Sequence, residues 1–410
     1  MTILAGAVAD RPAARAAPVP VVRFVGLAAA AFAVLYNLSP AGYESLSTGR
    51  IAALLLSMWV TLDRQAPRMQ LDWRLFVIFL PVPLVLAQFA LVHDPGQLSR
   101  FAHLGLYSFL CAWLLARLSR NLQTLLSAIV VAVTIQAVLI AISFVDFEFR
   151  GWIIQTIAQG TNVSAEDLYR APGFTGSGGS ALSVVQALGV LCGGLLLRQR
   201  LRSRTAVLAI VLAMFLCTMS AALVGRTGLL MSLLFTAWFL ATGAQSGRAI
   251  VTLLVLAVAT GMLVVRAAED LLPASFSAEV FTDYVLGFLV TGRDASVTDL
   301  ASMPIPPIGL ETLLGTGLVS ADVNGGNASG HDSGFIQAYY ALGLVYAIVL
   351  YASYAYVLLR VLSWLPAPTR WMLAIVFFAI EVKEPYLFKY SALFVLMACH
   401  TIAGSGRRAR

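Results

Sequence analysis

The chain has 410 residues, of which 60% are hydrophobic and only 11% are charged, and its formal net charge is +7. A soluble domain carries about a quarter charged residues, so no water-soluble fold can hide this much apolar surface and lipid must surround most of it. The basic residues are distributed among short segments between apolar runs. This pattern favours a membrane topology and argues against a nucleic-acid partner.

Apolar runs long enough to cross a bilayer, about 20 residues each, recur along the whole chain. They predict an all-α, polytopic transmembrane bundle of about 12 helices, which forms one integral membrane domain over 1–410. No small-residue cleavage site follows the first run, so we expect that helix to be retained. The expected helices are 21–38, 46–62, 75–93, 101–117, 122–143, 179–197, 205–223, 227–243, 249–266, 334–359, 370–383 and 387–403.

Arginine sets the expected orientation of these helices. With a cytoplasmic N-terminus, the cytoplasmic segments hold 18 basic and three acidic residues, and the other side holds nine basic and 17 acidic residues. Basic residues concentrate in cytoplasmic loops, so we expect both termini in the cytoplasm.

Two segments on the expected outer side are longer than a turn, at 144–178 and 267–333. Loops of this length inside a compact fold are usually functional or disordered. Both contain large apolar side chains, so we expect them to pack partly as short helices on the membrane surface.

Nine basic residues lie on the side where the topology rule disfavours them. Ionisable groups at membrane depth are costly and are usually functional. Arg226 is the sharpest case, because it stands between Gly225 and Gly228 with almost no loop to hold it in water, although an arginine at a helix end can also reach the lipid headgroups. The nine are Arg50, Arg100, Arg150, Arg170, Arg226, Arg266, Arg293, Lys383 and Lys389.

Two further arginines stand beside glycine. Arg293 follows Gly292 in the larger outer loop, where Asp294 offers a surface ion-pair partner as the alternative to a binding role. Arg170 precedes a glycine-rich stretch that ends at Gly179, which allows backbone amides to approach an anion. A flexible entry to the next helix explains that stretch equally well.

His331 is the only histidine of the larger outer loop. An imidazole there can accept the proton of a hydroxyl group, donate a hydrogen bond to a substrate, or be merely structural. Asp332 can orient it or can cap the following helix. Lys383 and Lys389 can extend an anion-binding face, but we expect Glu381 and Glu384 to neutralise them locally. No cysteine has metal-ligand spacing, so we expect no disulfide and no metal.

Four of these stretches, in this order, resemble the O-antigen polymerase and O-antigen ligase superfamily of bacterial envelope glycan enzymes. The resemblance covers about the last 240 residues with motifs, and the preceding part only in hydropathy. Asp332-Ser333-Gly334 is more similar to the polymerases, because the ligases more often carry an amide residue after the histidine. The stretches are Arg170 to Gly173, Gly225 to Leu230, Gly292-Arg293 with the Gly-x-Gly element within Ile308 to Gly317, and His331 to Phe335 with Tyr340 to Gly343.

The resemblance implies a metal-independent, inverting glycosyltransferase without a cofactor, which acts on glycans carried by undecaprenyl diphosphate at the periplasmic side of the bacterial inner membrane. Arg226 and Arg293 would bind the diphosphate, and Arg170 would help to bind the substrate by positioning the donor or the acceptor. His331 would activate the hydroxyl group of the glycan acceptor. Asp332, Lys383 and Lys389 are possible supporting residues. The resemblance leaves open a chain-length regulator protein as a further partner.

Three other functions remain open at this point. A ligase would move the finished glycan onto lipid A-core, with the same chemistry and another acceptor. A transporter of a solute or a lipid-linked sugar suits twelve helices, but the two halves of the chain show no repeat. A scaffold without catalysis leaves the outer arginines unexplained.

Overall fold

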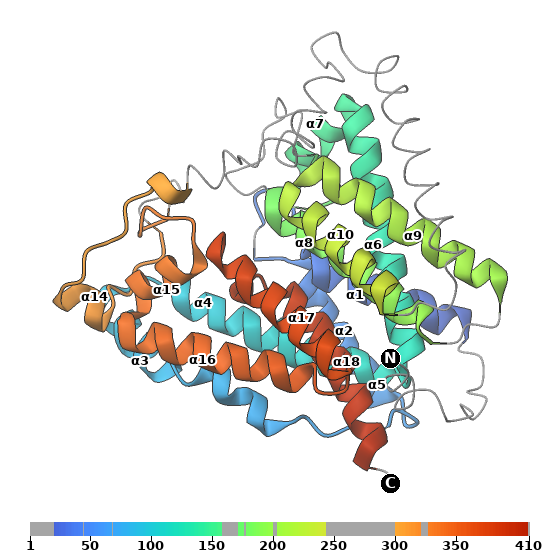
Figure 1. Cartoon of the computed structure of the whole chain (residues 1–410), viewed down its shortest axis with the longest axis horizontal. Coiled ribbons are helices and arrows are strands. Elements are labelled where there is room, and N and C mark those ends of the chain that lie inside the picture. Colours follow the sequence, from blue (N-terminus) through green and yellow to red (C-terminus); the bar gives the residue numbers. More distant parts are fainter. Residues whose placement is uncertain are drawn as a thin grey trace.

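The computed structural model describes residues 20–43, 45–67, 69–157, 171–175, 178–199, 203–242, 300–320 and 327–408. These residues form helices and loops, and the only β-pairing among them is two isolated bridges, Pro40 with Ile157 and Ser320 with Asn327 (Figure 1). The all-helical fold expected from the sequence is therefore confirmed. The expected helix at 249–266 and most of the 267–333 loop lie outside the described residues.

Six described helical segments are long and apolar enough to cross a membrane. They are Trp73–Val92 (η1, Trp73–Phe79, and α3, Val82–Val92), Gly96–Ser119 (α4, Gly96–His103, the π-helix η2, Leu104–Cys111, and α5, Ala112–Ser119), α6 (Leu122–Val145), α8 (Gly179–Leu197), α9 (Arg204–Val224) and α16 (Leu344–Val361). Four shorter helical segments are also apolar: α1 (Val21–Tyr36), α2 (Thr48–Leu62), α10 (Arg226–Ala241) and Ser391–Ser405 of α18 (Ser391–Arg408). The chain is thus built as a membrane protein.

The remaining elements are short. They are α7 (Phe147–Thr156), α14 (Leu310–Leu314), α15 (Gly334–Leu342), α17 (Ala367–Ala379), and the 3-10 turns η3 (Ile380–Val382) and η4 (Tyr386–Lys389). The prediction of one helix over 334–359 is wrong, because Gly343 has a φ of 82° and divides it into α15 and α16. A left-handed residue ends an α-helix, and glycine adopts that conformation at little cost.

Helix α8 is the centre of one half of the bundle, where it contacts α6, α9 and α10. Glycines make this close packing possible: a Cβ at Gly189 would lie 2.7 Å from Val133, and one at Gly194 would lie 2.2 Å from the Phe239 ring. Small residues commonly let membrane helices approach each other in this way.

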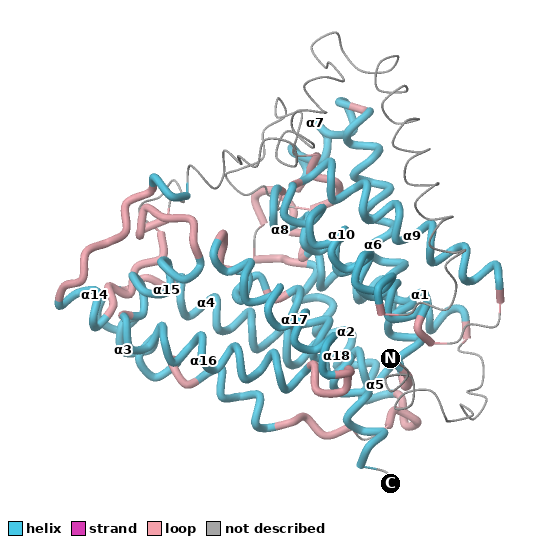
Figure 2. The backbone as a smooth tube through the Cα atoms, viewed as in Figure 1, coloured by secondary structure: helices cyan, strands magenta, loops and turns pink. Residues whose placement is uncertain are grey.

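The other half contains α3, α4, α5, α14, α15 and α16, and α18 joins the two halves through contacts with α5, α6, α8 and α16 (Figure 1). We call the end where α15 begins and α17 finishes the His331 end. Figure 2 shows that loops gather beside α14 and α15 at this end.

Ion pairs join the helices at the opposite end. Arg360 Nε lies 2.8 Å from Asp72 Oδ2, which ties α16 to the start of η1. Arg23 Nη1 lies 2.8 Å from Asp63 Oδ2, which ties α1 to the end of α2.

Candidate functional site

His331 lies in a tight loop directly before α15 and is 6% exposed. Its Nδ1 accepts a hydrogen bond from the backbone N–H of Ser333 at 3.0 Å, and the Ser329 hydroxyl donates to its carbonyl at 3.1 Å. A neutral imidazole that accepts at Nδ1 carries its proton on Nε2. The loop therefore fixes a ring whose Nε2 is a hydrogen-bond donor.

Asp332 is exposed, and its Oδ1 accepts a hydrogen bond from Asn327 Nδ2 at 3.0 Å. The neighbouring helix holds its backbone, because Gln337 Nε2 donates to the Asp332 carbonyl at 3.1 Å. The peptide that carries His331 is thus tied to the loop before it and to the first turns of α15.

Glu381, on η3, lies fully buried against this loop. Its carbonyl accepts a hydrogen bond from the Ser333 hydroxyl at 3.4 Å. Its carboxyl group accepts from the Tyr351 hydroxyl at 3.1 Å and from the backbone N–H of Leu387. Burial raises the pKa of Glu381 to about 8, because the low-dielectric surroundings disfavour the charged form more than these hydrogen bonds favour it.

Gly334 allows this contact between α15 and the 381–387 segment. A Cβ at Gly334 would lie 2.6 Å from Glu381 Oε2 and 2.7 Å from the Cα atom of Pro385. Only glycine fits between the two segments without moving the backbone, so His331 and Glu381 are held at a fixed separation.

Arg226 is the first residue of α10, and it is partly buried at the turn from α9. The turn is locked onto α8, because the Gly228 N–H donates to the Ser183 hydroxyl at 3.1 Å and a Cβ at Gly228 would lie 2.0 Å from the Ser183 carbonyl oxygen. A helix N-terminus carries positive potential, so an arginine here adds to a region that already attracts anions.

Lys383 connects this turn to the His331 loop. Its Nζ donates to the Thr227 hydroxyl at 3.3 Å, and Lys383 lies two residues after Glu381. Three hydrogen bonds, together with residues that are neighbours in the sequence, therefore form one series of contacts from the Arg226 turn to His331. Arg226 is next to Thr227, and Lys383 is two residues from Glu381.

Lys389 has a different environment. Its ammonium group forms an ion pair with Glu384 and lies 5.2 Å from the centre of the Tyr386 ring. The local neutralisation expected from the sequence is therefore confirmed for Lys389. Lys383 instead hydrogen-bonds to Thr227, as described above.

Arg100, on α4, is a residue whose role sequence reasoning missed. Its Nη2 donates to Gln337 Oε1 at 3.1 Å, and its guanidinium group lies 5.4 Å from the centre of the Phe388 ring. Through Gln337 it reaches the Asp332 carbonyl. Its place on the expected outer side was visible in the sequence, but nothing in the sequence pairs 100 with 337.

The Gly-x-Gly element, Gly315 to Gly317, packs against the end of α15, the helix that follows the His331 loop. The N–H groups of Thr316 and Gly317 donate to the carbonyls of Tyr340 and Ala341 at 3.0 and 2.9 Å. These carbonyls belong to the last turn of α15, where a helix lacks internal partners. A Cβ at Gly315 would lie 2.4 Å from the Leu342 backbone, so this element cannot sit so close with any other residue.

Two of the expected site residues, Arg170 and Arg293, lie outside the described part of the chain. Of the others, His331, Asp332, Arg226 and Lys383 lie along the series of contacts. Because burial raises the pKa of Glu381 to about 8, its carboxyl group adds little negative charge to this end of the bundle at neutral pH. This end of the bundle can therefore bind a multiply charged anion next to an imidazole N–H donor.

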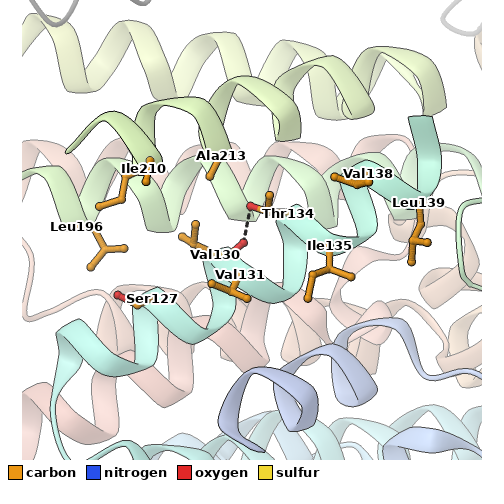
Figure 3. Close-up of a pocket in the computed structure, with 11 residues that line it drawn as sticks. Ser127, Val130, Val131, Thr134, Ile135, Val138, Leu139, Leu196, Ile210 and Ala213 are labelled. Atoms are coloured by element: carbon orange, nitrogen blue, oxygen red, sulfur yellow. Dashed lines mark hydrogen bonds between the residues drawn. The ribbon is translucent and has the colours of Figure 1, made fainter. Parts of the chain in front are cut away.

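A groove of about 460 Å³ lies between α6, α8 and α9, away from these residues (Figure 3). Val130, Val138 and Leu196 are among its apolar walls, and the hydroxyl of Thr134 donates to the Val130 carbonyl at 2.7 Å. It contains no charged side chain, so it suits a hydrocarbon chain and offers no group for catalysis.

No family model, curated protein or solved structure matches the chain.

Proposed function

We propose that the protein is a metal-independent glycosyltransferase that joins oligosaccharide repeat units carried on undecaprenyl diphosphate into a longer surface polysaccharide or exopolysaccharide. The observation that carries the proposal is the series of contacts that links Arg226, Lys383 and His331. A diphosphate leaving group needs fixed positive charge, and the arginine and lysine supply it beside a hydrogen-bond donor.

In the proposed reaction, a hydroxyl oxygen of the acceptor sugar attacks the anomeric carbon of the donor sugar. The bond from that carbon to the diphosphate breaks, and the diphosphate leaves with the electron pair. The hydroxyl proton passes to an oxygen of the departing diphosphate, and a single displacement inverts the anomeric configuration. Arg226 and Lys383 stabilise the negative charge that develops on the leaving group.

His331 contributes through Nε2–H in this scheme. The Ser333 N–H occupies Nδ1, so the ring donates a hydrogen bond to a substrate oxygen and does not remove the hydroxyl proton. Asp332 is the alternative acceptor for that proton, because its side chain is exposed beside the histidine. From the resemblance, Arg293 is proposed to bind the same diphosphate and Arg170 to position the donor or the acceptor.

The proposal includes a location. About twelve helices cross the bacterial inner membrane, both termini lie in the cytoplasm, and the His331 end faces the periplasm with the 144–178 and 267–333 loops. The arginine distribution supports this orientation. The donor and acceptor glycans and the bilayer are the partners, and a chain-length regulator is a further candidate.

Substitution in cells tests the enzyme. We expect His331→Ala and Arg226→Ala each to abolish glycan chain growth while the protein still inserts into the membrane. Arg204→Ala is the matched control, because Arg204 is exposed at the other end of α9. Wild-type chain lengths from both site variants would exclude the proposed reaction and would favour a transporter.

The accumulating species separates the polymerase from the ligase. Loss of a polymerase leaves single repeat units on the lipid carrier or on the core. Loss of a ligase leaves long chains on the carrier, and that result would replace the proposed acceptor with lipid A-core.

A further inference from the structure

The cations at the His331 end form two groups, and the proposed reaction uses only one of them. Arg226 and Lys383 lie at one end of the series of contacts. Arg100 lies at the other end, where it is joined to the His331 loop through Gln337 and the Asp332 carbonyl. His331 stands between the two groups along this series.

The guanidinium group of Arg100 is held in place before any substrate arrives. The Gln337 amide fixes one nitrogen and the Phe388 ring packs against the planar group. A planar fork held in this way matches the oxygen atoms of a phosphate, and its ordering cost has already been met.

Arg100 also lacks a counter-charge at contact distance. No carboxylate lies within 4 Å of it in the described ranges. The carboxyl groups that act on it from further away are Asp94 and Glu381. Asp94 already accepts hydrogen bonds from the N–H groups of Gly96 and Val319 at 2.7 and 2.8 Å.

We propose that Arg100 binds the diphosphate of the acceptor's lipid carrier, while Arg226 and Lys383 bind the diphosphate of the donor. This inference rests on the proposed function and deepens it. A polymerase joins two substrates that each carry a diphosphate, so it needs a cation group on each side of the reacting atoms. Gln337 then connects the acceptor's diphosphate to the peptide that carries His331.

The first experiment uses the full-length protein in liposomes and the lipid-linked oligosaccharide that accumulates in cells lacking it. One acceptor is this lipid-linked oligosaccharide, and the other is the same oligosaccharide released from its carrier by mild acid. Wild-type protein should prefer the lipid-linked acceptor. We expect Arg100→Ala to lower that preference at least tenfold, Arg226→Ala to lower transfer to both acceptors in parallel, and Arg204→Ala to change neither.

Equal losses with both acceptors would show that Arg100 acts only through the His331 loop, and wild-type rates with both acceptors would show that it has no role. Either result overturns the inference. Arg100→Lys keeps the charge and should recover part of the preference, which separates loss of binding from a folding defect.

The second measurement does not depend on catalysis. Native mass spectrometry counts the farnesyl diphosphate molecules bound to the purified protein. We expect two on the wild type, one on Arg100→Ala, one on Arg226→Ala and none on the double variant. The same count on the wild type and Arg100→Ala would overturn the inference. Absence of any transfer by a wild type that binds two would overturn the proposed function and leave the two anion sites standing.

Discussion

The backbone N–H of Ser333 donates a hydrogen bond to Nδ1 of His331 at 3.0 Å, and this one contact decides which nitrogen of the ring carries the proton. The hydrogen bond therefore distinguishes a proton-accepting role of His331 from a hydrogen-bond-donating role, which the sequence alone does not separate. A base needs a free lone pair on the nitrogen that faces the substrate, whereas this ring presents an N–H group there.

Replacement of His331 by glutamine and by glutamate distinguishes the two roles. Glutamine keeps an N–H donor at about the position of Nε2, so we expect His331→Gln to retain measurable transfer. His331→Ala and His331→Glu should lose about 100-fold or more, the usual cost of removing a donor that stabilises developing charge. Initial rates in liposomes measure this. Higher activity from His331→Glu than from His331→Gln would show that His331 acts as a base and not as a hydrogen-bond donor.

Glu381 gives the site a pH dependence at its alkaline side. Below about pH 8 the carboxyl group is protonated, because burial raises its pKa to about 8. As the pH rises through that value, a negative charge appears near Lys389 and Arg100 and weakens anion binding. We expect diphosphate affinity to fall across this range and Glu381→Gln to remove the fall. Glu384→Gln is the control, because Glu384 is paired with Lys389 on the same segment.

The same group affects stability. Between its ordinary pKa of 4.5 and about 8 the folded protein holds this proton and the unfolded chain has released it, so its contribution to stability decreases as pH rises across that window. Thermal melting of wild type and Glu381→Gln from pH 5 to 9 measures the slope. If the melting temperatures of the two proteins changed with pH in parallel, the raised pKa of Glu381 would be contradicted.

Gly315 and Gly343 face each other where the Gly-x-Gly element meets the end of α15. Both have positive φ, 85° and 82°, and a Cβ at Gly343 would lie 2.3 Å from the Leu313 carbonyl oxygen. We expect Gly315→Ala and Gly343→Ala each to lower the free energy of unfolding by at least about 1 kcal/mol, from the left-handed strain alone. Gly309→Ala is the control, because a Cβ there meets nothing within 4 Å. Chemical denaturation in detergent reports the difference, and three equal stabilities would refute it.

Asp72 and Arg360 should stabilise the opposite end without affecting substrate. Burial raises the pKa of Asp72, but the hydrogen bond and charge of Arg360 outweigh it and leave the pKa below the ordinary value of 3.8. The stabilisation is therefore present at neutral pH and is lost as the pH falls below that value. We expect Asp72→Asn to cost about 1 kcal/mol and to leave the KM for the lipid-linked oligosaccharide unchanged. A double-mutant cycle with Arg360→Met measures the coupling energy between the two side chains. A coupling energy of zero would show that the ion pair does not stabilise the protein.

Apolar runs predicted most helix positions because membrane helices depend on length and hydropathy, which a single sequence contains. Helix α6 was expected over 122–143 and spans Leu122–Val145. The break at Gly343 was missed, because one glycine in an apolar run does not interrupt the hydropathy pattern. The reason for the break lies at Gly315, 28 residues earlier.

The residues of the candidate site likewise divide into those that the sequence reveals and those that only tertiary contacts reveal. Arg226 and His331 were recognisable because their charge or chemistry is out of place in an apolar chain. Arg100 was recognised only as one of the outer basic residues and Glu381 only as a neighbour of Lys383, because their contacts with Gln337 and Ser333 are tertiary. The sequence placed Glu381 next to Lys383 and suggested neutralisation, whereas the η3 turn directs its carboxyl group to Tyr351 and Leu387.

The carbonyl groups that end α15 receive hydrogen bonds from Thr316, Gly317 and the side chain of Gln88, which reaches the Ala341 carbonyl at 3.0 Å. Because α3 and the Gly-x-Gly element hold this end while η3 holds the beginning, the helix has no freedom to slide along its axis. The depth of the His331 ring in the bundle is therefore set by the contacts at the two ends of the helix that follows it.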